Sequence, residues 1–420
     1  MRDEKTFLDP QPSTLKRIRK IGLYLDCSPP RGEFQINQFV LEAVATLPPD
    51  RFSVVVAYSS ELWSEYLKNY KLNTVHVQNG FWSRAICLGW TLLGLPVGLW
   101  RKICPLFHPL TRAFQKEQCD LWIFPSQNSR SYQIPVPALG SIHDLMHRYE
   151  RDFPEASSRR EFNYRERMFA NVCRWAKGVL VDSEMGRQQV AESYGMPLSR
   201  IHVLPFVAPP YIRESITPPG FDTRYSLPAK FMFYPAQFWE HKNHKRLIRA
   251  VARLRKDLPD LSLVLAGSPK NAYDSVVKLI HELDLSGNVH FLGYVPDEDM
   301  PELYRRARAL IMPTFYGPTN IPPLEAFVVG CPVAISGIYG MPEQVGDAAL
   351  LFDPKSESGI ADCMYRLWTD DRLCAELTEK GTIRASNWGQ KQYNERLLHI
   401  IDQVLETQSD PQQVRKGVTN

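Results

Sequence analysis

A polar loop lies between an apolar run that ends at Met312 and a helix-favouring segment that begins near Pro322. Such a loop can aim successive backbone N–H groups at one anion, and the helix start adds a partial positive charge. Pro318 has no N–H, so the expected donors are Gly317, Thr319, Asn320 and Ile321. Glu325, about one turn into the helix, can accept hydrogen bonds from vicinal hydroxyls. The loop and the helix start together suit a diphosphate. A strand–loop–helix unit with a surface glutamate is the structural alternative.

Two other segments carry polar side chains directly after apolar runs. Lys242 follows the run 231–234 at the start of a helical pattern, and His143 with Asp144 ends a second run. A lysine at a helix start is usually just solvated, and a His-Asp pair at a strand end is usually structural. Either group becomes chemically useful only if its strand ends at the same cleft as the loop before Pro322.

The triplet from Asp297 to Asp299 has the Asp-x-Asp spacing of two carboxylates that could hold a divalent metal. It lies just before a helix expected at Pro301. Acidic residues there complement the helix dipole and cap free N–H groups. We therefore predict helix capping by these residues and no metal site.

These residues are spaced by alternating apolar runs and helix-length amphipathic stretches. The strands expected in the first half are Ile21–Leu25, Ser53–Ala57, Leu121–Phe124, Leu139–Ile142, Val179–Val181 and Ile201–Leu204. Those in the second half are Phe231–Tyr234, Leu261–Ala266, Val289–Leu292, Ala309–Met312, Pro332–Ile335 and Leu350–Phe352. The expected helices are Ala156–Trp175, Ser183–Tyr194, Lys245–Arg255, Tyr273–Leu283, Pro301–Arg306 and Pro322–Val329. Aliphatic strands spaced by helices predict an α/β fold with parallel sheets covered on both faces.

A proline-rich stretch at 206–227 divides the two runs of elements, so two doubly wound domains are expected. The predicted parts are an N-terminal tail at 1–20, a first domain at 21–208, a linker at 209–227, a second domain at 228–384, a helical region at 385–406 that packs back on the first domain, and a polar tail at 407–420. A ligand is expected between the domains, at the carboxyl ends of the strands.

The stretch from Met312 to Val333 resembles the signature of the retaining GT-B glycosyltransferases, the family 4-like group 1 enzymes. The matching positions are Pro322, Pro323, Leu324, Glu325, Ala326, Gly330, Pro332 and Val333. Gly317 stands where the family carries the first glutamate of its Glu-x7-Glu motif, so its Gly-Pro-Thr-Asn sequence resembles a subgroup. The resemblance implies a GT-B fold, two Rossmann-like domains facing across a cleft, in which Glu325 binds the donor ribose.

The resemblance extends to the segment 234–247, where the family grips the donor diphosphate with an arginine and a lysine. Lys242 keeps the lysine role, whereas Gln237 replaces the arginine. His241, His244 or loop amides are then expected to assist.

Weaker similarities complete the implied site. Gly267 ends a strand before the nucleotide pocket, Tyr294 or Val295 contacts the base, and His143 contacts the donor sugar near the reacting carbon. Arg31 and Gly32 form the acceptor-side loop. His143 and Lys242 are the catalytic candidates.

The implied activity is transfer of a sugar, with retention, from a nucleotide-diphosphate donor to a saccharide or lipid-linked saccharide in cell-surface polysaccharide synthesis. The family generally works without a metal or other cofactor. Front-face attack and a short-lived covalent intermediate both stay open. Two alternatives remain: Gly317 and Gln237 permit an inactive nucleotide-sugar-binding subunit, and a sugar-nucleotide epimerase can share the two-domain layout.

Composition is ordinary for a globular protein of 420 residues, and a net charge of +4 is too small to indicate nucleic acid. The eight cysteines are scattered, with no metal-ligand spacing, and the N-terminus does not resemble a secretory signal. A cytoplasmic protein is therefore expected, with peripheral membrane contact as an addition.

That addition comes from the uncharged segment Ala85–Trp100, which is flanked by Arg84, Arg101 and Lys102. It is shorter than the ~20 residues of a spanning helix and is interrupted by glycine and proline. A buried helix and loop is the first interpretation, and seating on a membrane surface is the second.

Overall fold

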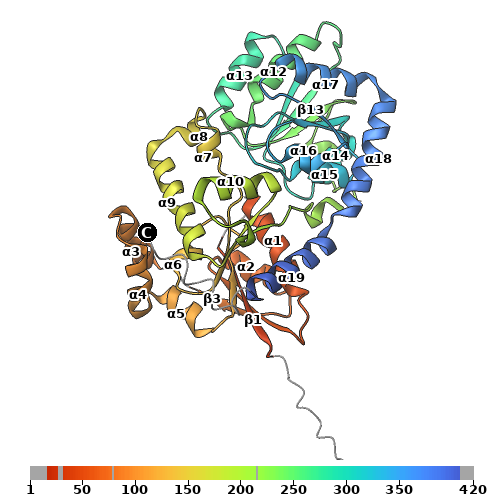
Figure 1. The fold of residues 1–420 in the computed structure, drawn as a ribbon. Helices are drawn as coiled ribbons and strands as arrows, with labels where there is room; N and C mark the ends of the chain where they lie inside the picture. Colours follow the sequence, from red (N-terminus) through yellow and green to blue (C-terminus); the bar gives the residue numbers. More distant parts are fainter. Residues whose placement is uncertain (1–16, 27–31, 78–79, 214–215, 407–420) are drawn as a thin grey trace, which may run out of the picture.

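The computed structural model describes residues 17–26, 32–77, 80–213 and 216–406, which form two sheets of entirely parallel strands (Figure 1). The first sheet has the order β3-β2-β1-β4-β5-β6-β7 and the second β10-β9-β8-β11-β12-β13. The strands of the first are β1 Arg19–Leu25, β2 Phe52–Tyr58, β3 Asn73–His76, β4 Leu121–Ile123, β5 Ala138–Ser141, β6 Gly178–Val181 and β7 Ile201–Val203. Those of the second are β8 Met232–Pro235, β9 Leu263–Ala266, β10 Val289–Gly293, β11 Ala309–Met312, β12 Val333–Ser336 and β13 Ala349–Phe352. The prediction of two doubly wound domains is confirmed.

Helices connect successive strands and cover the sheets (Figure 1). In the first domain they are α1 Gly32–Ala45, α2 Glu61–Leu67, α3 Phe81–Leu92, α4 Val97–Phe107, α5 Pro109–Lys116, α6 Arg130–Gln133, α7 Met146–Tyr149, α8 Pro154–Ser157, α9 Arg159–Trp175, α10 Glu184–Tyr194 and the 3-10 helix η1 Leu198–Arg200. From the linker onward they are η2 Pro210–Arg213, α11 Phe221–Arg224, η3 Glu240–Lys242, α12 His244–Leu254, α13 Tyr273–Glu282, α14 Met300–Arg306, α15 Pro322–Val328, α16 Met341–Val345, α17 Glu357–Thr369, α18 Asp371–Asn387 and α19 Gln390–Glu406.

Local sequence explains most element ends. Ser183 is the N-cap of α10, and its hydroxyl accepts from the Gly186 N–H at 3.0 Å. The helix expected over 156–175 is broken into α8 and α9, because Ser158 leaves the helical conformation and its hydroxyl caps α9 through Glu161. Central strands such as β9, β11 and β12 are buried at every residue, as parallel strands covered on both faces must be.

The C-terminal helix α19 packs on the first domain, although it follows the second in sequence. Its buried residues include Tyr393 and Leu397, which share a core with Phe39 of α1. The ring centers of Tyr393 and Phe39 lie 6.1 Å apart. Just before α19, the Trp388 indole donates to the Phe206 carbonyl oxygen at 3.0 Å. The chain therefore crosses between the domains twice (Figure 1, right).

The uncharged segment 85–100 forms the end of α3, a turn and the start of α4. Trp100 is buried, but Leu93, Leu95 and Leu99 are exposed, so the interpretation as a buried helix and loop is wrong for these leucines. Within the described ranges, no helix has the length and apolar character that crossing a bilayer requires.

Candidate active site

A cavity of about 420 Å³ lies where the carboxyl ends of β8, β9 and β10 face the start of α1. Five of the residues predicted for the site line it: Gly32, Gln237, Gly267, Tyr294 and Val295. Arg31, predicted beside Gly32, lies outside the described residues. The lining also includes Phe34, Gln35 and Asp297, which sequence reasoning did not assign to the site. The strand ends that doubly wound sheets use for ligands thus converge here.

Close packing of the backbone requires glycine at position 267. Its φ is +148°, and a Cβ at this position would lie 2.2 Å from the Ala236 carbonyl oxygen. Only glycine lets the end of β9 approach the end of β8 this closely, and the cavity wall is consequently backbone.

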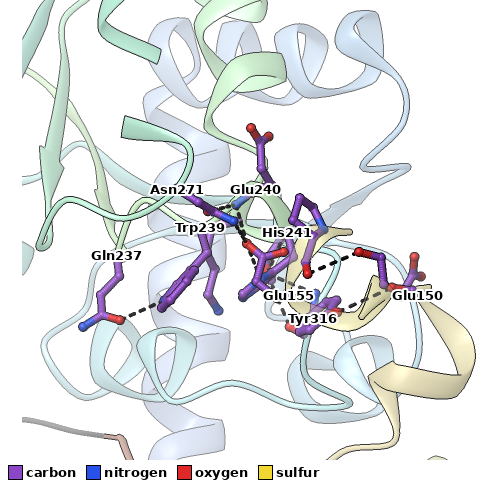
Figure 2. A network of polar contacts seen from close by, with 12 residues as sticks. Glu150, Glu155, Gln237, Trp239, Glu240, His241, Asn271 and Tyr316 are labelled. Atoms are coloured by element: carbon purple, nitrogen blue, oxygen red, sulfur yellow. Dashed lines mark hydrogen bonds and ion pairs between the residues drawn. The ribbon is translucent and has the colours of Figure 1, made fainter. Parts of the chain in front are cut away.

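Gln237 occupies the place of the expected arginine, and the structure gives it a different partner. Its side-chain oxygen accepts from the Trp239 indole N–H at 3.0 Å (Figure 2), and the Lys270 ammonium lies 5.3 Å from the center of the Trp239 ring. An amide and an indole, with a lysine beyond them, replace a fixed guanidinium at this end of the cavity.

Lys242 is aimed by the residue that follows it. Asn243 adopts a left-handed conformation with φ of +63°, and its amide donates to the carbonyl oxygens of Pro313 and Pro354 at 2.9 and 2.8 Å. This clamp ties the end of η3 to the loops after β11 and β13. Burial lowers the pKa of Lys242 to about 8, whereas Asp144 of the first domain acts to raise it. The Asp144 carboxylate, which follows His143, is therefore close enough across the interface between the domains to favour the charged form of Lys242.

A polar network next to Lys242 joins α8 of the first domain to the second domain (Figure 2). The Glu155 carboxylate of α8 accepts from the Glu240 backbone N–H and from the Asn271 amide, both at 2.9 Å. The His241 ring stacks on Tyr316 with ring centers 4.0 Å apart. Burial lowers the pKa of His241 to about 2, so this ring stays neutral and adds no cation to the site.

His143 is held as a neutral ring with a defined tautomer. Its Nε2 lies 2.8 Å from the Pro125 carbonyl oxygen, which can only accept, so Nε2 carries the proton and Nδ1 is an acceptor. Burial lowers the pKa of His143. Gln127 accepts from the His143 and Asp144 backbone N–H groups at 2.7 and 3.3 Å. Gln127 was missed, although its position just after β4 was a usable signal.

The loop before α15 is shaped by Gly317 and held by both domains. Gly317 has a φ of +90°, and a Cβ there would lie 2.7 Å from the Thr319 carbonyl oxygen, so a glutamate would be strained. The Thr319 hydroxyl donates to Asp182 of the first domain. The Asn320 N–H, expected to bind phosphate, instead donates to the Gln344 side chain at 3.0 Å.

Glu325 does not line the cavity itself; it is buried at the start of α15, behind the cavity residues Gln35 and Asp297. Its two carboxylate oxygens accept from the hydroxyls of Tyr211 and Tyr304. Tyr211 belongs to the linker, and the Gln35 amide of α1 donates to its hydroxyl at 3.1 Å. Burial raises the pKa of the Glu325 carboxyl, against the effect of both tyrosines. A ribose would therefore meet this carboxylate only by sharing it with Tyr211.

The capping role predicted for the acidic triplet is wrong for Asp299. It stands at the N-cap of α14 without a side-chain cap; its carboxylate instead binds Arg224 at 2.6 Å and the Tyr225 hydroxyl at 2.8 Å. Asp297 lines the cavity, and burial raises its pKa. Among the described residues, no group of three or more His, Cys, Asp or Glu side chains is arranged to hold a metal.

A larger cavity, about 630 Å³, lies next to Thr319. Asp182, Trp388 and residues of α18 line it. It lacks the glycine-lined strand ends of the smaller cavity, so the smaller one is the candidate donor site.

Residues 223–384 match the family model described as "Glycosyl transferases group 1". O-antigen chain mannosyltransferase B of Escherichia coli is 27% identical over 288 residues, covering 67% of this chain and 74% of that protein. Mannosylfructose-phosphate synthase of Agrobacterium fabrum is 25% identical over 278 residues. That match covers 61% of each chain.

Solved structures show the same architecture over nearly the whole chain. HepE of Anabaena in complex with UDP and glucose has a TM-score of 0.69 at 17% identity, covering 91% of this chain and 99% of HepE. Sucrose-phosphate synthase from Thermosynechococcus elongatus also has a TM-score of 0.69 at 17% identity, covering 93% of this chain and all of that one. At such identities the likeness establishes the fold.

Proposed function

We propose that this chain, which has the GT-B fold, is a glycosyltransferase that moves a hexosyl group from a nucleotide-diphosphate donor with retention of anomeric configuration. The observation that carries the donor class is the cavity at the carboxyl ends of β8, β9 and β10, whose wall at Gly267 is bare backbone. The mannosyltransferases among its relatives make mannose the first sugar to test.

The chemistry assigned to the site is stabilisation of a departing diphosphate. Lys242 supplies a fixed positive charge, held by the Asn243 clamp, where negative charge builds as the glycosidic bond breaks. The neutral His143 ring, with Nδ1 as an acceptor, would bind a hydroxyl of the donor sugar. Gln237 and Trp239 would contact the donor where the arginine is missing. Retention by front-face attack would leave the acceptor proton to a donor phosphate oxygen.

The proposed acceptor is a saccharide or a lipid-linked saccharide of a cell-surface polysaccharide, in keeping with the O-antigen relative. The start of α1, with Gly32 and Phe34 in the cavity wall, is the first-domain surface nearest the donor. We also propose that the reaction needs no metal and no cofactor. The Asp299 carboxylate, the strongest candidate ligand by spacing, is already bound by Arg224.

The test is incubation with a panel of nucleotide sugars, GDP-mannose first, followed by mass spectrometry of the products with and without EDTA. Slow hydrolysis or transfer that survives EDTA supports the proposal, and an absolute requirement for added Mg²⁺ or Mn²⁺ contradicts its metal-free part. Epimer formation would instead identify an epimerase. Thermal stabilisation by a nucleotide sugar without turnover on any acceptor would identify an inactive binding subunit.

A further inference from the structure

Helix α4 has apolar side chains on two opposite faces. The inner face carries Trp100 and Cys104, which are buried with Cys87 of α3 in a small core of their own. The Trp100 indole donates to the Gln133 carbonyl oxygen at 3.0 Å, which anchors this face to α6. On the outer face, Leu99 is 48% exposed and Leu106 is 73% exposed. Because the inner face already holds the helix in place, the outer leucines do not serve the fold.

The turn between α3 and α4 extends this apolar surface. Gly94, with φ of +66°, reverses the chain, and Leu93 beside it is 75% exposed. Leu95, on the other side of the turn, is also exposed. Figure 1 shows α3 and α4 at the outer edge of the first domain, away from the second.

The charge of this region is as one-sided as its apolar surface. From Tyr66 to Lys116 the sequence has seven lysines and arginines and no acidic residue, whereas the rest of the chain has more acidic than basic residues. Lys102 is exposed, three residues after Leu99 and four before Leu106, which places it on their face of α4. Exposed leucines around a lysine, in a stretch of sequence without acidic residues, match the boundary between the headgroups and acyl chains of an anionic bilayer.

We propose that the outer surface of the α3–α4 hairpin seats the protein on an anionic lipid bilayer. Leu93, Leu99 and Leu106 enter the acyl boundary, and Lys102 remains among the headgroups. The proposal does not depend on the donor or the acceptor of the reaction. It assigns to the first domain a function beyond the cleft.

The experiment is cosedimentation of the full chain with vesicles of phosphatidylcholine alone or with added phosphatidylglycerol. Wild-type protein should sediment with the anionic vesicles and much less with the neutral ones. Leu99→Glu/Leu106→Glu should lower the vesicle partition coefficient by about tenfold or more. Lys102→Ala, which keeps both leucines, should lower it by about fivefold, an effect that disappears at high salt.

The matched control is Leu198→Glu/Ile383→Glu, which changes two aliphatic side chains on other elements. These side chains are 50% and 53% exposed. The control variant should bind vesicles like wild type. Thermal unfolding and hydrolysis of nucleotide sugar without lipid check that each variant is folded. Failure of the wild type to bind anionic vesicles, equal binding to neutral ones, or unchanged binding of Leu99→Glu/Leu106→Glu would overturn the proposal. The proposal would also be overturned if the wild type were a dimer and Leu99→Glu/Leu106→Glu dissociated it, since this face of α4 would then join two copies of the chain.

Discussion

At the scale of single residues, the proposed site depends on Lys242, whose pKa is lowered by burial. Burial brings the pKa of Lys242 to about 8, so the ammonium form dominates at neutral pH and is lost above pH 8. If transition-state stabilisation requires the charged form, kcat/KM should fall as pH rises through about 8. An enzyme whose kcat/KM stays level to pH 9.5 would show that this charge is not used.

Replacing the same lysine tests its contribution directly. Lys242→Ala should reduce kcat by roughly 100-fold with a smaller effect on donor affinity, since the contact strengthens as the diphosphate departs. Gln237→Arg in that background should restore part of the rate if the glutamine is a simple gap. Because Gln237 already binds Trp239, an arginine at this position could instead crowd the cavity and lower the rate. The single variant Gln237→Arg measures that loss of rate. Wild-type turnover of Lys242→Ala would remove the lysine from the mechanism.

Glu325 allows binding to be separated from packing. Glu325→Gln should weaken donor binding by about 1–3 kcal/mol if the carboxylate binds the ribose and still accepts the hydrogen bond from the Tyr211 hydroxyl. Tyr304→Phe is the matched control, because it removes a contact to the other carboxylate oxygen on the side of the core. It should lower the unfolding temperature and leave donor affinity nearly unchanged. Equal losses of donor affinity in both variants would mean that Glu325 only packs.

At the scale of elements, the turn from η3 into α12 positions the lysine. Asn243→Ala should lower the free energy of unfolding by about 2–4 kcal/mol, because two buried carbonyl groups lose their donor and alanine is strained at positive φ. Asn243→Gly loses the same hydrogen bonds without the strain and should be less destabilised. Thermal or urea unfolding measures both. An equal loss in the two variants would show that strain contributes nothing.

The elements that could be predicted are those with one dominant signal. Strands such as β11 and β12 are short aliphatic runs buried on both faces, and they lie where the apolar runs placed them. The edge strand β3 was missed because Asn73 and Thr74 are polar and exposed, which leaves no apolar run to detect. Within the site, contacts such as Glu155 with Asn271 join residues 116 apart in sequence, and no local pattern encodes them.

At the scale of the whole molecule, the contact between the two domains includes the Asp182 carboxyl group, whose pKa is raised by burial. Burial raises the pKa of Asp182 to about 7, although Thr319 and Ser183 donate to it. Because this pKa lies above the unfolded value of 3.8, the stability it contributes is present at low pH and is lost as pH rises toward and through 7. Asp182→Asn should therefore raise the unfolding temperature most at pH 8.5, less at pH 5 and little below pH 4.

The control for this interface is Thr319→Val, which removes the hydroxyl donor to Asp182. It should lower the unfolding temperature at both pH values, because the carboxyl group loses a partner in either protonation state. A pH-independent effect of Asp182→Asn would contradict the assigned titration.

The return of α19 to the first domain has a consequence for synthesis on the ribosome. The core around Phe39 includes Tyr393, Leu397 and Ile401, so the domain that is translated first is completed only when the end of α19 has emerged. The second domain, whose strands end with β13 at Phe352, has its sheet complete earlier. We therefore expect the usual order, in which the N-terminal domain folds first, to be reversed. A nascent chain stalled before α19 should carry a protease-resistant second domain beside a protease-sensitive first one.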